Sequence, residues 1–582
     1  MTLPLLLHMH QPDYRHPATG EPVLPWVRKH ALRGYRDVPW LLHRTGARAT
    51  INLVPSLLDQ LDHYAAGGMD PAFRLLHIPF ASLSAEQRLQ LADEATLGSP
   101  RRLAWFPAFA RLVERPAASL SEPELLDRIV WGELAWFGFS ALTDHPILAR
   151  FRLQGTGFTQ VDLDAVVAIQ REILRELRAL YQGLPEVSAS PWFHPILPLL
   201  VNTAHADRCL PGVPDPGFAF PEDAEDQLRQ GKARVSAWIG APVIGLWPSE
   251  GSVSPEVVRM AAALGFDWIA SDEEVLARSD PNADPSRPAR FENATLVFRD
   301  HALSDRVGFT YQGWPGERAA VDLIRRAGNR PALLALDGEN PWEHYEDAGE
   351  AFLTALLTSR HTSTVGDFVR DTPARGIDQL HTGSWIHADF KIWIGHEEDR
   401  AAWRLLAAAR RTWDRVGRPE AARLHLYAAE GSDWFWWYGD EFSNPVGHIF
   451  DELFRAHLTA AYQAMDVEPD PALDLPIRTE DAGEIPVFAI GEADDWLAWQ
   501  SASLLTIRGS AMARVGGPRR LWVGLRHDEL IVRAIHAEGW AVGPTGTEAR
   551  ITDGAAILAF SSVFALHAPD GEHVAAWRLR VG

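Results

Sequence analysis

The sequence predicts an α/β protein, with a barrel of parallel strands followed by a helical bundle and a small C-terminal β-domain. Three observations support this fold class. Short apolar runs that end in polar residues recur through residues 1–375; helix-like segments separate several of them; later the pattern changes to helical spacing and then to short alternating segments. Near-continuous apolar runs are typical of parallel strands buried on both faces.

Each predicted strand leads into a polar tip. The apolar runs are residues 3–7, 50–54, 243–247, 268–270, 296–298 and 332–336. A predicted helix follows the third run: Ser254 is a capping side chain, Pro255 suits the first helical position, and Gly265 suits the helix end. Because active sites of such barrels lie at the carboxyl ends of the strands, we expect the chemistry at these tips.

The chain of 582 residues is too long for one hydrophobic core, so several domains are expected. The predicted division is a catalytic barrel at 1–375, a helical domain at 376–470 that completes the active-site cleft, and a small β-sandwich-like domain at 476–582. Residues 401–416 and 421–430 show helical patterns, and a Pro- and Asp-rich linker occupies residues 466–476. Alternating segments at 521–525 and 529–535 predict the strands of the last domain.

The composition of the chain excludes several classes of partner and of structural site. The net charge of −22 repels phosphate backbones, so no nucleic-acid partner is predicted. Cys209 is the only cysteine, which excludes intramolecular disulfides and Cys-ligated zinc. No apolar run approaches the ~20 residues of a membrane span, and the first residues lack the basic region of a signal peptide. We therefore expect a cytoplasmic protein with no membrane partner; the oligomeric state is not predicted.

His8 and His10 lie at the end of the first predicted strand, where alternation points both to one side. One interpretation is a metal site of the kind that barrel hydrolases build on His-x-His. Another is a pair of neutral hydrogen-bond partners for sugar hydroxyls, and a third is two structural histidines. A single His-x-His is weak evidence for a metal, so neither a metal nor a cofactor is predicted.

Two acidic positions also follow apolar runs. Glu250 comes three residues after Trp247, and Asp337 comes two residues before Glu339. Either segment alone could be a helix cap or a solvated turn. Two carboxylates at different strand tips, however, are what glycoside hydrolysis needs, with one ionised and one protonated. A separation of about 5–5.5 Å would imply retention of anomeric configuration, and a wider one inversion.

The densest aromatic run lies between Glu430 and Asp440 and contains Trp434 and Trp436. Such a run is usually buried core. Here Asp433 and Asp440 bracket it and glycines interrupt it, so we predict a loop that faces substrate. The 23 tryptophans of the chain agree with a sugar site, because indole faces stack on pyranose rings, and agree equally with a large core.

Five stretches in order resemble the motifs of glycoside hydrolase family 57. They are residues 8–12, 131–137 with 190–200, 245–250, 336–340 and 429–440. The resemblance covers about residues 3–465. It implies an incomplete (β/α)7 barrel followed by helices, a retaining mechanism, α-glucan substrates and no required metal.

The resemblance also implies roles for individual residues. Glu250 would be the nucleophile and Asp337 the general acid/base. The implied substrate-binding residues are His8, His10, Trp247, His194, Glu133, Asp433, Trp434 and Trp436. The segment after residue 476 is outside the motifs, and we expect it to serve packing.

Residues 247–251 look most like the amylase and amylopullulanase branch of the family, which implies hydrolysis of α-1,4 bonds and, as a further option, α-1,6 bonds. The same residues would serve a 4-α-glucanotransferase or a branching enzyme. An alternative from another class is a zinc-dependent barrel hydrolase or deacetylase that uses His8 and His10. A non-catalytic glucan-binding protein is a third option, against which both carboxylates argue.

Overall fold

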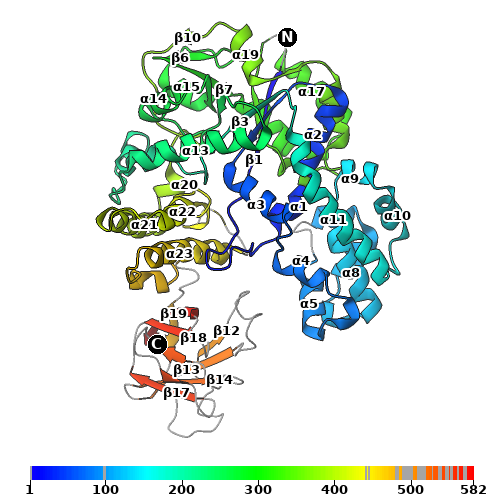
Figure 1. Ribbon diagram of the computed structural model, residues 1–582, viewed down its shortest axis with the longest axis vertical. Helices are drawn as coiled ribbons and strands as arrows, with labels where there is room; N and C mark the ends of the chain where they lie inside the picture. Colours follow the sequence, from blue (N-terminus) through cyan, green and yellow to red (C-terminus); the bar gives the residue numbers. More distant parts are fainter. Residues whose placement is uncertain are drawn as a thin grey trace. The chain divides into compact units, whose positions relative to one another are not determined.

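A computed structural model describes residues 3–95, 100–328, 330–439, 442 and 446–478, together with strands between residues 484 and 581 (Figure 1). The chain forms two compact units. The first, here called the barrel unit, comprises Met1–Ile394 and Glu430–Asp433. The second, the C-terminal unit, comprises Gly395–Ala429 and Trp434–Gly582. The predicted domain boundaries at 375, 470 and 476 stay predictions.

The barrel unit is built on seven parallel strands in the order β7-β5-β4-β3-β2-β1-β8. Their bounds are β1 Leu3–Met9, β2 Thr50–Leu53, β3 Glu186–Ala189, β4 Gly245–Leu246, β5 Trp268–Asp272, β7 Ala294–Arg299 and β8 Leu334–Asp337. A single parallel bridge between Arg299 and Leu333 joins the two ends of this row. The predicted α/β barrel is confirmed, and it is an incomplete one, because β7 and β8 do not pair as neighbouring strands of the described sheet.

Three short strands extend the sheet. β6 (Ala289–Phe291) pairs antiparallel with β7, β10 (Arg375–Gly376) pairs with β6, and β9 (Thr362–Ser363) pairs with β1. Inside the barrel, buried apolar side chains form one cluster: Leu6, Trp247, Trp268, Ala270, Val297, Leu333, Ala335, Val365 and Phe368. This cluster fixes the strands whose carboxyl ends carry the predicted site.

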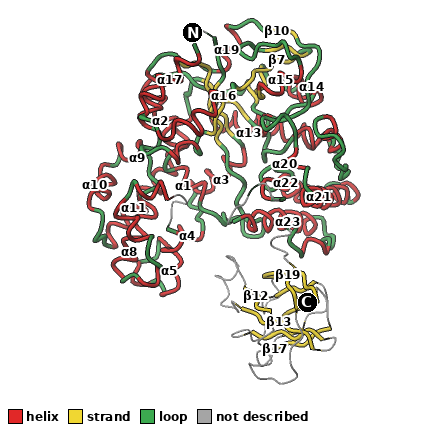
Figure 2. Tube along the Cα trace, turned by 180° about the vertical axis from the view of Figure 1, so that it is seen from behind, coloured by secondary structure: helices red, strands yellow, loops and turns green. Residues whose placement is uncertain are grey.

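Helices flank the strands on both sides (Figures 1 and 2). The connecting helices are α13 Pro221–Ile239, α14 Pro255–Ala263, α15 Glu273–Ser279 and α17 Gly316–Ala327, and α19 Val365–Asp371 follows β9. In α14, the hydroxyl of Ser254 accepts the N–H of Val257, and Gly265 after the helix adopts a φ of 75°. This helix was predicted from its capping residue and its terminal glycine, and it is confirmed.

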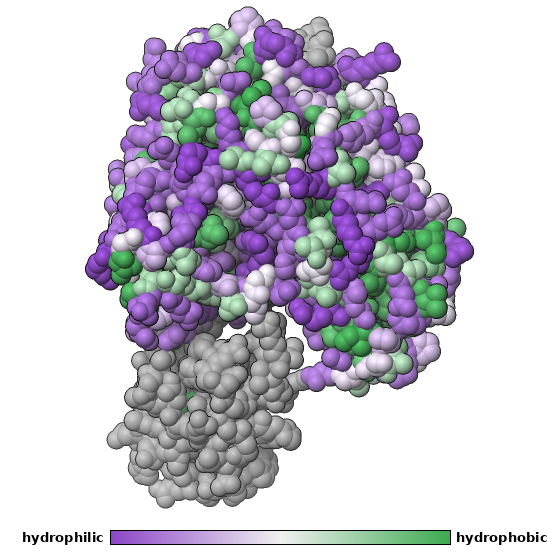
Figure 3. Space-filling view, in the orientation of Figure 1, coloured by the Kyte–Doolittle hydropathy of each residue, from purple (hydrophilic) through white to green (hydrophobic). Residues whose placement is uncertain are grey.

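A large helical insertion separates β2 from β3. Its main helices are α3 Pro55–Ala65, α4 Pro71–Leu76, α5 Ala85–Glu94, α8 Glu122–Leu134, α10 Pro146–Gln154 and α11 Gln160–Tyr181, and α1 Trp26–Ala31 and α2 Gly34–Thr45 precede β2. Hydrophilic side chains cover most of the face of the barrel unit shown in Figure 3, while hydrophobic ones gather over this insertion. No helix in the described part of the chain combines the length and apolarity needed to cross a membrane.

The C-terminal unit contains three long helices, α21 Glu397–Arg415, α22 Glu420–Ala429 and α23 Gly447–Ala464. The helices predicted at 401–416 and 421–430 correspond to the first two. Its described strands form two sheets, ordered β11-β19-β18-β15-β16 and β12-β13-β14-β17. β13 (Arg520–Arg526) and β14 (Glu529–Ala534) match the strands predicted there.

Candidate active site

The register of the barrel sheet aligns polar residues across neighbouring strands. His8 of β1 lies opposite Asn52 of β2 and Asp337 of β8, and Asn52 lies opposite Ser188 of β3. Nδ1 of His8 is 2.6 Å from Oδ1 of Asn52, whose amide nitrogen donates to Oγ of Ser188 at 3.0 Å. Burial and the neighbouring His10 lower the pKa of His8 to about 3. His8 is therefore a neutral imidazole at physiological pH, with its proton on Nδ1.

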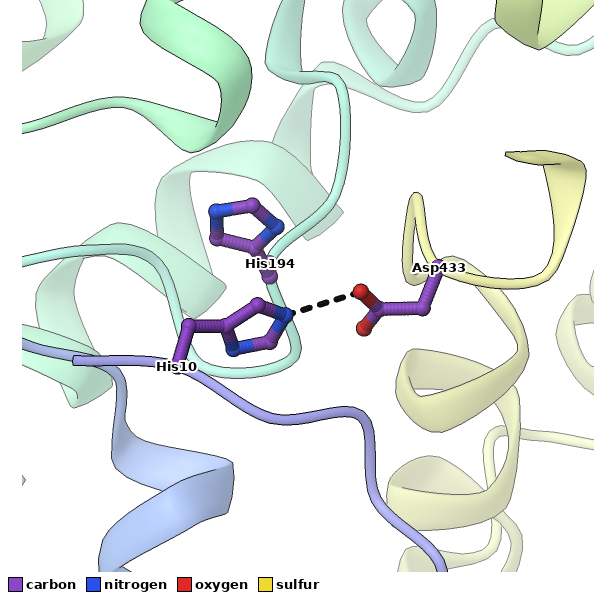
Figure 4. Close-up of side chains that lie close together, drawn as sticks. All are labelled: His10, His194 and Asp433. Carbon is purple, nitrogen blue, oxygen red and sulfur yellow. Dashed lines mark hydrogen bonds and ion pairs between the residues drawn. The ribbon is translucent and has the colours of Figure 1, made fainter. Parts of the chain in front are cut away.

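His10, His194 and Asp433 lie together just beyond the strand ends (Figure 4). Nε2 of His10 is 2.8 Å from Oδ1 of Asp433, and the rings of His10 and His194 stack with centroids 4.0 Å apart. His194 adopts a left-handed φ of 57°. Among the described residues, this is the group of three His or carboxylate side chains whose ligand atoms all lie within 4.8 Å of one another.

The segment Glu430–Asp433 belongs to the barrel unit because several contacts hold it there. Ser432 donates its N–H to the carbonyl of His194 at 3.0 Å, and its hydroxyl lies 3.0 Å from Nδ1 of that residue. Oε2 of Glu430 accepts the side-chain amide of Gln227 at 2.6 Å. The predicted loop thus places Asp433 beside His10, although the two residues are 423 positions apart in the sequence.

Glu250 follows β4 in a strained conformation, with φ 57° and ψ 25°. Such left-handed geometry in a residue other than glycine costs of order 1–3 kcal/mol and is concentrated at functional sites. Its Oε2 accepts the indole N–H of Trp385 at 2.8 Å, and its carbonyl accepts the main-chain N–H of the same residue at 2.9 Å. Its Oε1 lies 3.8 Å from Nδ1 of His194. The carboxylate is thus oriented by a donor and buried against the histidine pair.

Asp337 ends β8 and is partly buried. Burial raises the pKa of Asp337, although the amide of Asn340 donates to its Oδ2 at 3.1 Å and His10 and Arg299 oppose the rise. The pKa of the neighbouring Glu339 is raised further, by burial and by Asp337 itself. A carboxyl group whose surroundings favour the protonated form is suited to general acid catalysis.

Gly338 separates Asp337 from Glu339 at the end of β8, where the chain passes close to β1. Its N–H donates to the carbonyl of His8 at 2.6 Å, which continues the pairing of β8 with β1. A Cβ at this position would lie 2.2 Å from Sδ of Met9. A larger residue between the acid positions and the first strand would therefore require the Met9 side chain to move.

Three of the predicted substrate-binding side chains are buried in other surroundings. Trp247 is 2% exposed in the barrel core, and Trp434, also 2% exposed, donates its indole N–H to the carbonyl of Ala428 within the C-terminal unit. No indole face is open to a sugar ring in either case, so a stacking role for these two has no support in the structure. Trp436 is partly exposed and lies against Phe442, with ring centroids 5.3 Å apart. Asp440 lies outside the described residues.

Glu133 is the third predicted substrate-binding residue whose side chain is buried in other surroundings. It sits on α8 in the helical insertion, where Arg28 and Lys29 reach its carboxylate oxygens at 2.5 and 2.7 Å. Although burial raises the pKa of Glu133, these two cations overcome it and hold it at about 2. Both oxygens serve a buried ion-pair network, so the structure gives Glu133 a place in the insertion rather than beside Glu250 and Asp337.

Trp385 was missed by the sequence predictions, which placed residues after 375 in a helical domain. The segment around it pairs with the segment of the nucleophile candidate: Val253 and Gly383 exchange main-chain hydrogen bonds at 2.9 and 3.1 Å. The guanidinium of Arg299 lies over the Trp385 ring, 5.2 Å from its centroid. No local pattern marks this contact, because residues more than 130 positions apart make it.

The structure changes which residues could form the zinc site considered from the sequence. His8 is not part of the convergent group of three, and its Nδ1 is engaged by Asn52. The second histidine is His194, which comes from the loop after β3. The alternative pair of His8 and His10 is thus replaced by His10, His194 and Asp433 as the side chains with metal-ligand geometry.

Comparisons with solved structures give matches at low identity. A branching enzyme of glycoside hydrolase family 57 from Thermococcus kodakaraensis, solved in complex with glucose, matches with 16% identity and a TM-score of 0.51, over 80% of this chain and 90% of that one. An α-amylase from Thermotoga maritima matches with 12% identity and a TM-score of 0.49, over 80% and 93%. A 4-α-glucanotransferase from Thermococcus litoralis matches with 11% identity and a TM-score of 0.45, over 97% and 87%.

A search of curated proteins gave no match. The family model described as glycosyl hydrolase family 57 matches residues 4–378. That match covers more than half of the chain. It extends from within β1 to beyond β8 and includes His8, Glu250, Asp337 and Arg299. The protein belongs to glycoside hydrolase family 57.

Proposed function

We propose that the protein is a retaining hydrolase of α-glucans, of the amylase or amylopullulanase type, in which Glu250 is the nucleophile and Asp337 the general acid/base. The observation that carries the proposal is the difference in the surroundings of the two carboxyl groups. Glu250 is buried and accepts the indole N–H of Trp385, which orients its carboxylate, whereas burial raises the pKa of Asp337. An oriented nucleophile and a carboxyl group that retains its proton are the pair that glycoside hydrolysis uses.

The proposed reaction has two steps. In the first, the proton of Asp337 passes to the glycosidic oxygen while an Oε atom of Glu250 bonds to the anomeric carbon and the glycosidic C–O bond breaks. In the second, the Asp337 carboxylate removes a proton from water, the water oxygen bonds to the anomeric carbon, and the bond to Glu250 breaks. His8, as a neutral imidazole, and His10 would hydrogen-bond the hydroxyls of the sugar beside the cleaved bond.

The substrate part of the proposal draws on the family and on the similar solved structures, which are those of an amylase, branching enzymes and a glucanotransferase. All of these activities handle glucans. Hydrolysis and transfer share the first step and differ in whether water or a sugar hydroxyl completes the second. The resemblance of residues 247–251 to the amylase branch favours water.

The test is a product analysis of wild type and Glu250→Gln on soluble starch, pullulan and maltoheptaose, with a chelator present. We expect shorter maltooligosaccharides from wild type and none from the variant, and NMR of the first product should show the α-anomer. Cleavage of pullulan would add α-1,6 bonds. Products longer than maltoheptaose would replace hydrolysis by 4-α-glucan transfer, and new α-1,6 branches would replace it by branching. Loss of all cleavage in chelator, restored by zinc, would overturn the proposal in favour of a metal-dependent hydrolase.

A further inference from the structure

We propose that His10, His194 and Asp433 form a binding site for a divalent transition metal of the zinc type, and that a metal bound there blocks the site. The binding itself is independent of the activity proposed above. The blocking effect rests on that proposed function, because it assigns Glu250 the nucleophile's role.

The three side chains present the ligand atoms that zinc prefers. Nε2 of His10 and Oδ1 of Asp433 are already 2.8 Å apart, and the stacked rings of His10 and His194 are inclined by only 24°. In Figure 4 each ring directs a nitrogen toward the carboxylate. Two imidazole nitrogens and one carboxylate oxygen, with one position left open, are a recurrent zinc ligand set. Ca²⁺ and Mg²⁺ prefer oxygen ligands and fit this set poorly.

The ligand atoms come from three different parts of the barrel unit. His10 follows β1, His194 lies in the loop after β3, and Asp433 is in the segment that Ser432 ties to His194. His194 is 2% exposed, has a left-handed φ of 57°, and stacks its ring on that of His10 with centroids 4.0 Å apart. The position of the ligands is therefore fixed by the fold rather than by a flexible surface group.

Metal binding would replace existing contacts rather than fill a bare site. A cation at this point displaces the hydrogen bond between His10 and Asp433 and the contact of Nδ1 of His194 with the hydroxyl of Ser432. The outer nitrogens, Nδ1 of His10 and Nε2 of His194, are buried and have no hydrogen-bond partner within the described part of the chain. Tight zinc sites orient each histidine by a bond to that outer nitrogen. We therefore infer reversible binding, not a permanent structural metal.

Blocking follows from the distance to Glu250. Its Oε1 lies 3.8 Å from Nδ1 of His194, so a cation held by that nitrogen would attract the carboxylate that must attack the sugar. The cation would also occupy His10, which the proposed reaction uses for a sugar hydroxyl. Zinc and glucan should therefore compete for the same place.

The binding experiment uses the full chain after chelation and dialysis. Co²⁺ is the probe, because its visible absorption reports tetrahedral coordination, and Zn²⁺ is then added to displace it. We expect one strong Co²⁺ site in wild type. His194→Gln and Asp433→Asn should each weaken it by more than about tenfold, since even outer-shell changes cost 10–100-fold. His8→Gln is the matched control: the ring of His8 stacks on His194 at 5.1 Å but is not a ligand, so the affinity should fall much less than in the other two variants.

Several outcomes would overturn the binding proposal. Equal Co²⁺ absorption in all variants would assign the signal to surface histidines. Loss of the site in His8→Gln with retention in Asp433→Asn would assign it to the His8–His10 pair. Circular dichroism of each variant identifies misfolding, and Glu250→Gln, which keeps all three ligands, serves as a second protein in which the site must still form.

The blocking experiment measures glucan cleavage against Zn²⁺ at several substrate concentrations. We expect KM to rise with Zn²⁺ while kcat holds, and Asp433→Asn to need more than about tenfold higher Zn²⁺ for the same relative effect. Unchanged cleavage at saturating Zn²⁺ would overturn the blocking part. If wild type cleaves no glucan yet shows the Co²⁺ site, the proposed function fails while the metal site stands.

Discussion

Trp385 holds Glu250 at two points: its indole N–H donates to Oε2 at 2.8 Å and its main-chain N–H donates to the carbonyl at 2.9 Å. The side chain of the nucleophile candidate and its strained backbone are thus oriented by one residue. The indole in turn rests on the guanidinium of Arg299.

Trp385→Phe should lower kcat by about 10- to 100-fold, because a hydrogen bond to a charged group contributes about 1.5–3 kcal/mol. The phenyl ring keeps the packing but leaves the carboxylate without its donor, so the acidic limb of the pH–rate profile should move to higher pH. Steady-state kinetics between pH 4 and 8 measure both effects. Trp413→Phe is the control, since it removes an indole bond to the carbonyl of Pro419 within the C-terminal unit and should leave both values unchanged. An unshifted acidic limb in Trp385→Phe would show that the bond does not act on Glu250.

Asp337→Asn should reduce starch cleavage by about 10²- to 10⁴-fold, the usual contribution of general acid–base catalysis. The asparagine matches the size of the aspartate but has no proton to give to the leaving oxygen. A 4-nitrophenyl maltooligosaccharide needs no such proton, so the variant should form the glycosyl-enzyme at a nearly normal rate and release an initial burst of nitrophenol. Stopped-flow absorbance checks the burst. Equal losses on starch and on the aryl glycoside would remove Asp337 from the acid role.

The raised pKa of Asp37 leads us to expect that the free energy of unfolding depends on pH. Burial raises its pKa to about 7, although Ser140 donates both its main-chain N–H and its hydroxyl to Oδ1. A carboxyl group with a raised folded pKa costs no stability below its unfolded value of 3.8, and the cost grows as pH rises toward 7. Asp37→Asn should therefore raise the melting temperature at pH 8 more than at pH 4. Thermal unfolding at the two pH values measures this, and an equal shift at both would contradict it.

Glu133→Gln separates a structural from a substrate-binding role. Removing one partner of a buried ion pair costs about 3–5 kcal/mol. Here Lys29 would lose its carboxylate, and Arg28 would keep only that of Asp70. We expect a large fall in melting temperature with KM for maltooligosaccharides unchanged at a temperature where the variant is folded. A raised KM at full folding would instead return Glu133 to the substrate site.

The sequence predicted the barrel and the positions of its acids well, because these depend on local patterns. Apolar runs before His8, Glu250 and Asp337 identify strand ends, and parallel strands bring their ends to one edge. β3 was missed, since Glu186 and Ser188 interrupt its apolar run. Both side chains are explained by the tertiary structure: Ser188 bonds Asn52, and Glu186 accepts the hydroxyl of Thr50.

The predictions that gain no support from the structure concern which face a side chain presents. Trp247 and Trp434 occur in motifs that resemble sugar-binding segments, yet their rings pack inward. Aromatic composition does not distinguish a platform from a core residue. Trp385 and the pairing of His10 with Asp433 arise only when distant segments meet, so no spacing along the chain could have revealed them.

The bridge between Arg299 and Leu333 marks the junction of β7 with β8, here called the seam of the barrel. Besides this bridge, the N–H of Asp300 donates to the carbonyl of Leu333 at 2.8 Å, and Nε of Arg299 reaches the carbonyl of Ala335 at 3.1 Å. Arg299 therefore both fastens the seam and carries the ring that holds Glu250. A disturbance that parts β7 from β8 would therefore reach the carboxylate of Glu250 through two side chains, those of Arg299 and Trp385.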